Sequence, residues 1–235
     1  MLKNLAKKLL TNQGTPRDQY KRSYSQCGED LIVKYIFDVL AISKPAYMDI
    51  GAHHPYYLSN TALFYELGSR GINIEPDPTL MQVFLQYRKE DMNLNIGISE
   101  TKGDLDFYII NNPVLNTFSR DEAENYYKEG DYRIVDQKKV PVDTIQSVLM
   151  QYCNGQCPEF LSIDAEGVDE VVLKSLDLAR NFPIVICVET ISFSNTGKGK
   201  KNHALIEFIQ SQGYLLYADT YINSIFVRRE KWENQ

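Results

Sequence analysis

Residues 47–55, YMDIGAHHP, bring an aspartate, a glycine and two histidines to the end of a short apolar run. The run predicts a buried strand, and Gly51 predicts the tight turn that ends it. In an open α/β sheet, ligands bind beyond the carboxyl ends of the strands, so this turn is a candidate binding loop. A diphosphate loop needs the glycine pattern GxGxxG, whereas Gly51 is followed by His53, His54 and Pro55. The turn therefore disfavours a dinucleotide diphosphate.

A second candidate binding residue, Glu75, ends the next predicted strand, GINIEP. A carboxylate in that place accepts hydrogen bonds from both hydroxyls of an adenosine ribose. It serves NAD and S-adenosylmethionine equally well, so Glu75 alone does not choose between them. The structural alternative is that Asp49 and Glu75 only cap turns.

Two further carboxylates, Asp164 in SIDAEG and Glu189, end the predicted fourth and fifth core strands. Adjacent parallel strands would bring them close together above the sheet. There they could hold Mg²⁺ or a similar divalent cation, which chelates substrate oxygens and lowers the pKa of a hydroxyl. The metal-free alternative has His54 or Asp164 taking the hydroxyl proton directly. In a third alternative, Asp164 and Glu189 only satisfy loop amides.

The elements that would position these residues alternate between strands and helices. The predicted strands cover residues 46–50, 71–76, 94–99, 104–110, 138–142, 159–167, 183–189, 214–219 and 224–230. The predicted helices cover 25–40, 62–68, 79–89, 168–178 and 204–213, with another beginning at Thr144. This alternation implies parallel strands joined by right-handed crossovers.

The last two predicted strands, YLLYAD and SIFVRRE, are separated only by a short turn. Such a pair implies an antiparallel hairpin added to a parallel sheet. A dinucleotide dehydrogenase domain would instead continue with another crossover helix. Together with the single-glycine turn and Glu75, the hairpin favours S-adenosylmethionine as the cofactor. We predict an α/β fold of the class I methyltransferase (Rossmann-like) type, with a seven-stranded, mostly parallel sheet and a C-terminal antiparallel hairpin.

The domain organisation follows from the absence of repeats, linkers and low-complexity tracts. We predict a lead-in over residues 1–24 and a single domain over 25–235, with an insertion near 104–142. A long, polar, tyrosine-rich stretch inside the insertion has weak periodicity, so it is expected to be a loop. Its tyrosines either offer stacking faces and a lid for a sugar ring or pack on the surface; they are Tyr126, Tyr127 and Tyr132.

Composition excludes several classes of partner. The chain has 235 residues, a net charge of -6 and a sequence pI near 5.2, which disfavours a broad nucleic-acid-binding face. No apolar run approaches the roughly 18 residues of a transmembrane helix, and the start, MLKNLAKKLL, lacks a signal peptide's apolar region.

The four cysteines form no disulfide framework, so we expect reduced thiols and a cytoplasmic protein. The basic run TGKGKKNH either attracts an anionic acceptor or is a solvated loop.

An ordered set of motifs over residues 25–188 resembles the FkbM family of S-adenosylmethionine-dependent methyltransferases. The motifs are SQCGEDLIV, YMDIGAHHPYYLSNT, GINIEPDP, NIGIS, VPVDTI and FLSIDAEGVDEVVL. The resemblance implies a class I methyltransferase fold and methylation of hydroxyl oxygens on sugars, polysaccharides or polyketide-type metabolites.

The same resemblance implies roles for individual residues. Asp49, Gly51 and Ala52 would line the cofactor loop, Glu75 would hold the ribose, Asn95 and Ile96 would flank the adenine, and Gln26, Ser59 and Asn60 would lie near the methionine end. Many family members have an Asn-Gly type loop where this chain has His54 and Pro55, and the His-Pro form is a family variant. Adjacent histidines generally point in different directions, so at most one faces the acceptor, and the family's His-Pro pattern implies that it is His54 rather than His53. His54 and Asp164 are the predicted catalytic residues.

The sequence thus predicts an S-adenosylmethionine-dependent O-methyltransferase acting on a hydroxyl of a small molecule or glycan. A divalent cation such as Mg²⁺, held by Asp164 and Glu189, remains an open alternative for activating that hydroxyl. A second hypothesis is a catalytically inactive protein that uses the cofactor fold to bind a partner through the insertion. An NAD-dependent oxidoreductase is the third, and the turn and the hairpin disfavour it.

Overall fold

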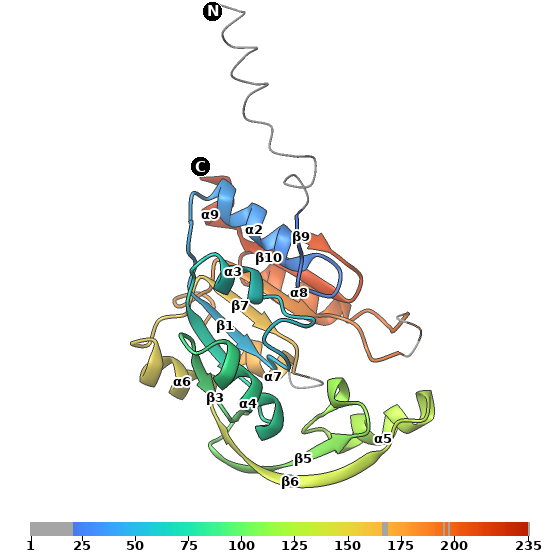
Figure 1. The fold of residues 1–235 in the computed structure, drawn as a ribbon. Coiled ribbons are helices and arrows are strands. Elements are labelled where there is room, and N and C mark those ends of the chain that lie inside the picture. The colour runs from blue at the N-terminus through green and yellow to red at the C-terminus, as the bar shows by residue number, and fades with distance from the viewer. Residues whose placement is uncertain (1–20, 166–168, 195, 197, 235) are drawn as a thin grey trace, which may run out of the picture.

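The computed structural model describes residues 21–165, 169–194, 196 and 198–234 (Figure 1). Most of the predicted lead-in, residues 1–20, lies outside the described residues, and the division into a lead-in and one domain stays a prediction. The strands form a seven-stranded main sheet and a three-stranded second sheet. None of the helices in the described part of the chain combines the length and apolarity needed to cross a bilayer.

The main sheet has the strand order β3-β2-β1-β7-β8-β10-β9. Its strands are β1 (Tyr47–Ile50), β2 (Gly71–Ile74), β3 (Met92–Leu94), β7 (Phe160–Ile163), β8 (Val185–Glu189), β9 (Tyr214–Asp219) and β10 (Asn223–Arg228). Strands β3, β2, β1, β7 and β8 run parallel, whereas β10 pairs antiparallel with both β8 and β9. This is the predicted class I methyltransferase sheet with its C-terminal hairpin, so the fold class is confirmed.

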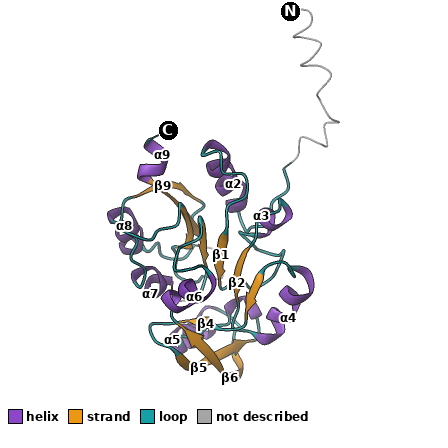
Figure 2. Ribbon diagram, turned by 90° about the vertical axis from the view of Figure 1, so that its left-hand side faces the viewer, coloured by secondary structure: helices purple, strands orange, loops and turns teal. Residues whose placement is uncertain are grey.

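Helices cover both faces of the main sheet (Figure 2). They are α2 (Glu29–Val39), α3 (Ala62–Glu66), α4 (Pro78–Tyr87), α6 (Ile145–Tyr152), α7 (Asp169–Lys174), α8 (His203–Ser211) and, at the C-terminal end, α9 (Arg229–Glu233). Alternate residues of β1 point to opposite faces, as the pleat of a strand requires. Met48 packs in the core under α6, α7 and α8, whereas Tyr47 packs with α2 and α3. The result is a three-layer α/β/α arrangement.

The predicted strand at 94–99 is wrong as a single element. The chain leaves the main sheet after β3 and enters the second sheet at β4 (Gly97–Ile98), where Gly97 pairs with Val142. The turn between the two strands is held by Asn95, whose side-chain amide donates to the carbonyl oxygens of Glu75 and Pro76 at 2.8 and 3.0 Å.

The insertion forms the second sheet, a curved ribbon beside the main sheet (Figure 1). Strands β5 (Gly103–Ile110) and β6 (Ile134–Asp143) pair antiparallel. The loop expected between them instead contains a short 3₁₀ helix at Pro113–Leu115 and α5 (Arg120–Glu129), capped by Ser119. The described side chains of α5 bury only Ala123 and Tyr126, which explains its weak periodicity.

A buried ion pair at the end of α4 links this helix to β1, α3 and β2. Arg88 is fully buried, and its Nε and Nη2 lie 2.9 and 2.8 Å from Asp91 Oδ2. Arg88 also donates to the Tyr47 hydroxyl of β1 at 2.6 Å and to Thr61 Oγ1 at 2.9 Å. Asp91 accepts the backbone N–H of Gly71, the first residue of β2, at 2.9 Å. Both charges are therefore fully hydrogen-bonded, as buried charges must be.

We expect Asp91→Ala to lower the free energy of unfolding by about 3–5 kcal/mol, because it leaves the Arg88 guanidinium buried without its counter-charge. The neighbouring Glu90 is a matched control, since it pairs with Arg70 on the surface. Glu90→Ala should cost less than about 1 kcal/mol. Urea denaturation of both variants measures the difference, and equal losses would contradict a structural role for the buried pair.

Candidate functional site

A pocket opens where β1, β2 and β7 end at the same edge of the main sheet. The register pairs Ile50 of β1 with Ile74 of β2 and with Ile163 of β7, so the residues that follow these strands converge. Asp49, Gly51, Glu75 and Asp164 all line this pocket, which we call the sheet-end pocket. The sequence-predicted candidates at the three strand ends are thus brought together.

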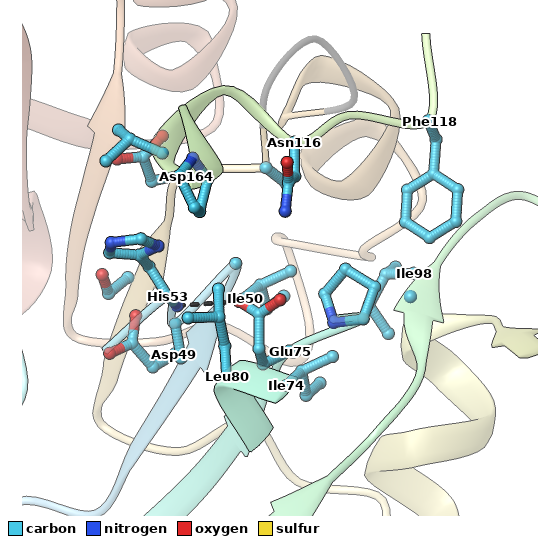
Figure 3. Close-up of a pocket in the computed structure, with 18 of the residues that line it drawn as sticks. Asp49, Ile50, His53, Ile74, Glu75, Leu80, Ile98, Asn116, Phe118 and Asp164 are labelled. Carbon is cyan, nitrogen blue, oxygen red and sulfur yellow. Dashed lines mark hydrogen bonds between the residues drawn. The ribbon is translucent and has the colours of Figure 1, made fainter. Parts of the chain in front are cut away.

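The insertion supplies the opposite wall. Phe107, Asn116 and Phe118 line the sheet-end pocket from that side. In Figure 3, Asn116 and Phe118 lie across the pocket from Glu75 and Leu80. Asn116 donates from Nδ2 to Asp77 Oδ2 at 3.0 Å and accepts the Ile110 N–H at 2.9 Å, so it joins the insertion to the loop after β2. Sequence reasoning missed this wall, because nothing local indicates that the insertion folds back over the sheet.

Gly51 makes the closest backbone approach in the pocket. Its φ is +75°, a conformation that L-residues with side chains rarely adopt. A Cβ at this position would lie 1.9 Å from the carbonyl oxygen of Asp164. The N–H groups of Gly51 and Ala52 both donate to the Ile74 carbonyl, at 3.0 and 3.1 Å, and Asp164 N donates to the Ile50 carbonyl at 2.9 Å. The turn is therefore fixed across the ends of β2 and β7.

Glu75 lies at the end of β2 and is only 4% exposed. Its Oε2 accepts the His53 N–H at 2.8 Å, and its Oε1 accepts the Asp77 N–H at 2.7 Å. Burial raises the pKa of Glu75 to about 7 despite these two hydrogen bonds, which favour the ionised form. Each carboxylate oxygen can accept another hydrogen bond, so the group retains acceptor capacity toward a ligand.

Asp49 and Asp164 differ in their access to the sheet-end pocket. Asp49 is buried, and its Oδ2 accepts the hydroxyl of Thr61 at 2.6 Å. Asp164 is an exposed residue, and it also lines the pocket. Desolvation, and then the negative charges of Asp169 and Asp49, raise the pKa of the Asp164 carboxyl above its usual range. Asp164 is therefore the reachable carboxylate of the two.

The other residues predicted to bind the cofactor divide into two groups. Besides the four residues at the strand ends, Ala52 and Asn60 line the sheet-end pocket. Four residues predicted to bind the cofactor do not line this pocket: Gln26, Ser59, Asn95 and Ile96. Gln26 is exposed, and the Oγ of Ser59 accepts the Ala62 N–H at the start of α3. Asn95 lies in the turn between β3 and β4, and Ile96 packs against the core.

The two histidines differ in their access to the sheet-end pocket. His53 lines the sheet-end pocket, whereas His54 does not. The Nδ1 atom of His54 accepts the N–H groups of Tyr56 and Tyr57 at 3.1 and 2.9 Å, so this ring stabilises the turn that follows. The φ of His53 is +52°, in the left-handed region, so the backbone between the two histidines is not extended. A sequence pattern does not reveal such a conformation at a non-glycine residue.

The expected metal site finds no support in the described part of the chain. Asp164 lines the sheet-end pocket, whereas Glu189 lines a second pocket beyond the end of β8. Across the described residues, no group of three or more His, Cys, Asp or Glu side chains is placed to hold a metal ion. The arrangement offers a carboxylate that can accept a proton, in a pocket lined by three acids.

Comparison with known proteins identifies a family. Residues 49–216, well over half of the chain, match the model described as the methyltransferase FkbM domain. No curated protein matches the sequence.

Solved structures with a similar chain course include three methyltransferases. A TehB-like SAM-dependent methyltransferase from Corynebacterium glutamicum has a TM-score of 0.41 at 12% identity, covering 96% of this chain and 97% of that one. A putative RNA methyltransferase from Pyrococcus horikoshii has a TM-score of 0.41 at 10% identity, with coverages of 96% and 97%. A Burkholderia thailandensis 1,6-didemethyltoxoflavin-N1-methyltransferase, solved with S-adenosylhomocysteine, has a TM-score of 0.40 at 8% identity, with coverages of 95% and 85%. The family match, and not these distant structures, carries the assignment.

The Gly51 turn yields a test of the site's geometry. Gly51→Ala should lower the free energy of unfolding by about 2 kcal/mol or more, because the methyl group meets the Asp164 carbonyl and φ is positive. The matched control is Gly103→Ala, since a Cβ at Gly103 has no neighbour within 4 Å. The control should stay within about 0.5 kcal/mol of the parent protein. Thermal unfolding compares the two, and an unchanged Gly51→Ala midpoint would rule out the close approach.

Proposed function

Since the chain belongs to the FkbM family of S-adenosylmethionine-dependent methyltransferases, we propose that it methylates a hydroxyl oxygen of a sugar, polysaccharide or related metabolite. The observation that carries the proposal is the Asp164 carboxylate, which lines the sheet-end pocket and is open to solvent there. An alcohol is a weak nucleophile at neutral pH, so a positioned proton acceptor is the group that its methylation needs.

The chemistry of the sheet-end pocket suits a cationic cofactor. Asp49, Glu75 and Asp164 give it three carboxyl groups, and the one glycine of the turn leaves no cradle for phosphates. Such a lining repels a diphosphate, which argues against NAD, and attracts a sulfonium. When bound, S-adenosylmethionine supplies a methyl group on a positively charged sulfur that departs as a neutral thioether. Glu75 would accept the two ribose hydroxyls, and Asp49 would support the loop from below.

The adenine is best accommodated on the apolar side of the same pocket. Leu80, Ile98 and Phe118 line that side, and Phe107 contacts Phe118 with ring centroids 4.7 Å apart. This assignment replaces Asn95 and Ile96, which the sequence suggested for the adenine. The insertion would then hold the base in place as well as cover it.

Asp164 would act as the base. In the displacement, a lone pair of the acceptor hydroxyl forms the new oxygen–carbon bond, and the hydroxyl proton passes to the Asp164 carboxylate. A raised pKa makes this carboxylate a better proton acceptor near neutral pH than an ordinary aspartate. His54 is not part of this proposal, because its Nδ1 is used by the turn.

We also place the enzyme in the cytoplasm. The support is that Cys27, Cys153, Cys157 and Cys187 are all free thiols, which persist in a reducing compartment. The net charge of -6 supports a small-molecule or glycan acceptor over a nucleic acid.

The division of roles between Glu75 and Asp164 is directly testable. Glu75→Gln should weaken binding of S-adenosylhomocysteine by about tenfold or more, because one ribose contact is lost. Asp164→Asn should leave that affinity unchanged and reduce turnover by about 10²–10⁴-fold. Calorimetric titration gives the affinities, and S-adenosylhomocysteine release with glycoside acceptors gives turnover. Equal loss of affinity in both variants would contradict the proposed roles.

The pH dependence of cofactor binding gives a second test. Glu75 accepts two ribose hydroxyls best when ionised, and its pKa is raised to about 7. Affinity for S-adenosylhomocysteine should therefore rise by up to about tenfold between pH 6 and pH 8 as Glu75 loses its proton. Glu75→Gln should flatten this dependence. A parent protein whose calorimetric affinity does not change over that range would show that the ionisation of Glu75 does not govern binding.

A further inference from the structure

A second pocket lies beyond the end of β8 and has a volume of ≈ 580 Å³. Its walls come from the end of β8, the start of α7, the start of α8 and the insertion helix α5. The volume is within the range of pockets that bind small molecules. We call it the β8 pocket, and the proposed function gives it no role so far.

The β8 pocket adjoins the proposed base. Ile163 of β7 pairs with Val188 of β8, so Asp164 and Glu189 follow in register at the same edge of the sheet. Asp164 lines the sheet-end pocket, and Glu189 lines the β8 pocket. A hydrogen bond of 2.9 Å from Ala165 N to Asp169 Oδ1 links the walls of the two pockets, since Ala165 lines the first and Asp169 the second. The β8 pocket and the carboxylate of the proposed base therefore lie at the ends of neighbouring strands.

One wall of the β8 pocket is a fixed aromatic ring. Phe193 lines it, and the ring packs edge-on against Tyr126 and Tyr132 with centroid distances of 4.7 and 5.5 Å. Tyr126 is only 1% exposed, so Phe193 is backed by buried structure. A rigid ring offers an apolar surface to the C–H face of a sugar at little cost in conformational entropy.

The charged groups of the β8 pocket are mostly acidic. Glu122, Asp169, Glu170 and Glu189 line it, against Lys200 and Lys201, which leaves two negative charges in excess when His203 is neutral. The Nζ of Lys201 is further engaged by Asp219 Oδ1 and the Tyr221 carbonyl oxygen, both at 2.7 Å. Carboxylates accept hydrogen bonds from hydroxyl or ammonium groups and repel phosphate. The basic run TGKGKKNH therefore does not make the pocket an anion site.

We propose that the β8 pocket binds the acceptor, and that this acceptor is an uncharged or aminated sugar and not a phosphorylated or carboxylated one. The proposal rests on the proposed methyltransferase function. The sugar ring lies against Phe193, and Glu122 and Glu189 accept its hydroxyl or ammonium protons. One hydroxyl then points to Asp164, which would take its proton as the new oxygen–carbon bond forms and the bond between the methyl carbon and the sulfur of the cofactor breaks.

Acceptor preference tests the proposal. The parent enzyme is incubated with S-adenosylmethionine and a panel of methyl glycosides, each offered in neutral, 2-amino, 6-phosphate and uronate form. Release of S-adenosylhomocysteine should be at least about tenfold faster with the neutral or amino form than with either anionic form. Preference for an anionic form, or no release with any sugar, overturns the proposal.

Variants of α5 test whether the acceptor binds in the β8 pocket. Glu122→Gln should raise the KM for the preferred glycoside about tenfold, because a charge-assisted hydrogen bond is lost. Glu124→Gln makes the same change on the same helix, but Glu124 pairs with Arg120 outside the pocket and should have no effect. Equal KM values for the two variants would overturn the assignment.

Calorimetry separates this proposal from the proposed function. Both α5 variants should bind S-adenosylhomocysteine with the affinity of the parent protein. If the parent binds S-adenosylhomocysteine but prefers an anionic sugar, the acceptor proposal alone fails. If the parent does not bind it at all, the proposed function fails as well.

Discussion

The buried Arg88–Asp91 ion pair is the interaction on which the sheet edge depends. A guanidinium out of contact with water must have every charge and donor satisfied, and here its partners come from β1, α3 and the chain after α4. Thr61, which accepts from Arg88, donates in turn to Asp49. The position of the first carboxylate under the sheet-end pocket is therefore set by a charge that never meets the ligand.

The insertion completes what the main sheet begins. The sheet presents carboxylates and a tight turn at its edge, but it leaves them facing open solvent. Asn116 and Phe118 close that side of the sheet-end pocket, and the hydrogen bond from Asn116 to Asp77 fixes the distance between the two walls. A low-dielectric wall beside carboxyl groups strengthens their interaction with a cationic ligand. The main sheet supplies the acidic groups, and the wall formed by the insertion strengthens their attraction for a cationic ligand.

Much of the site was predictable, because it lies where local signals are strong. The apolar run before Gly51 and the position of Glu75 at the end of a strand depend on chain order alone, and both were expected. The wall formed by Asn116 and Phe118 could not be predicted, since both residues lie in the irregular segment before α5, whose packing is decided by distant residues. The orientation of the two histidines could not be predicted for a different reason. The left-handed φ of His53 is not indicated by its residue type.

One short piece of the insertion borders both pockets. Phe118 contributes to the wall of the sheet-end pocket, and Glu122, in the first turn of the following helix α5, contributes to that of the β8 pocket. A ligand in either pocket would therefore contact the same short segment of the chain. Thermodynamic linkage makes the effect mutual: any factor by which occupancy of one pocket changes affinity in the other applies equally in the reverse direction. The insertion could in this way couple the two pockets through its conformational entropy.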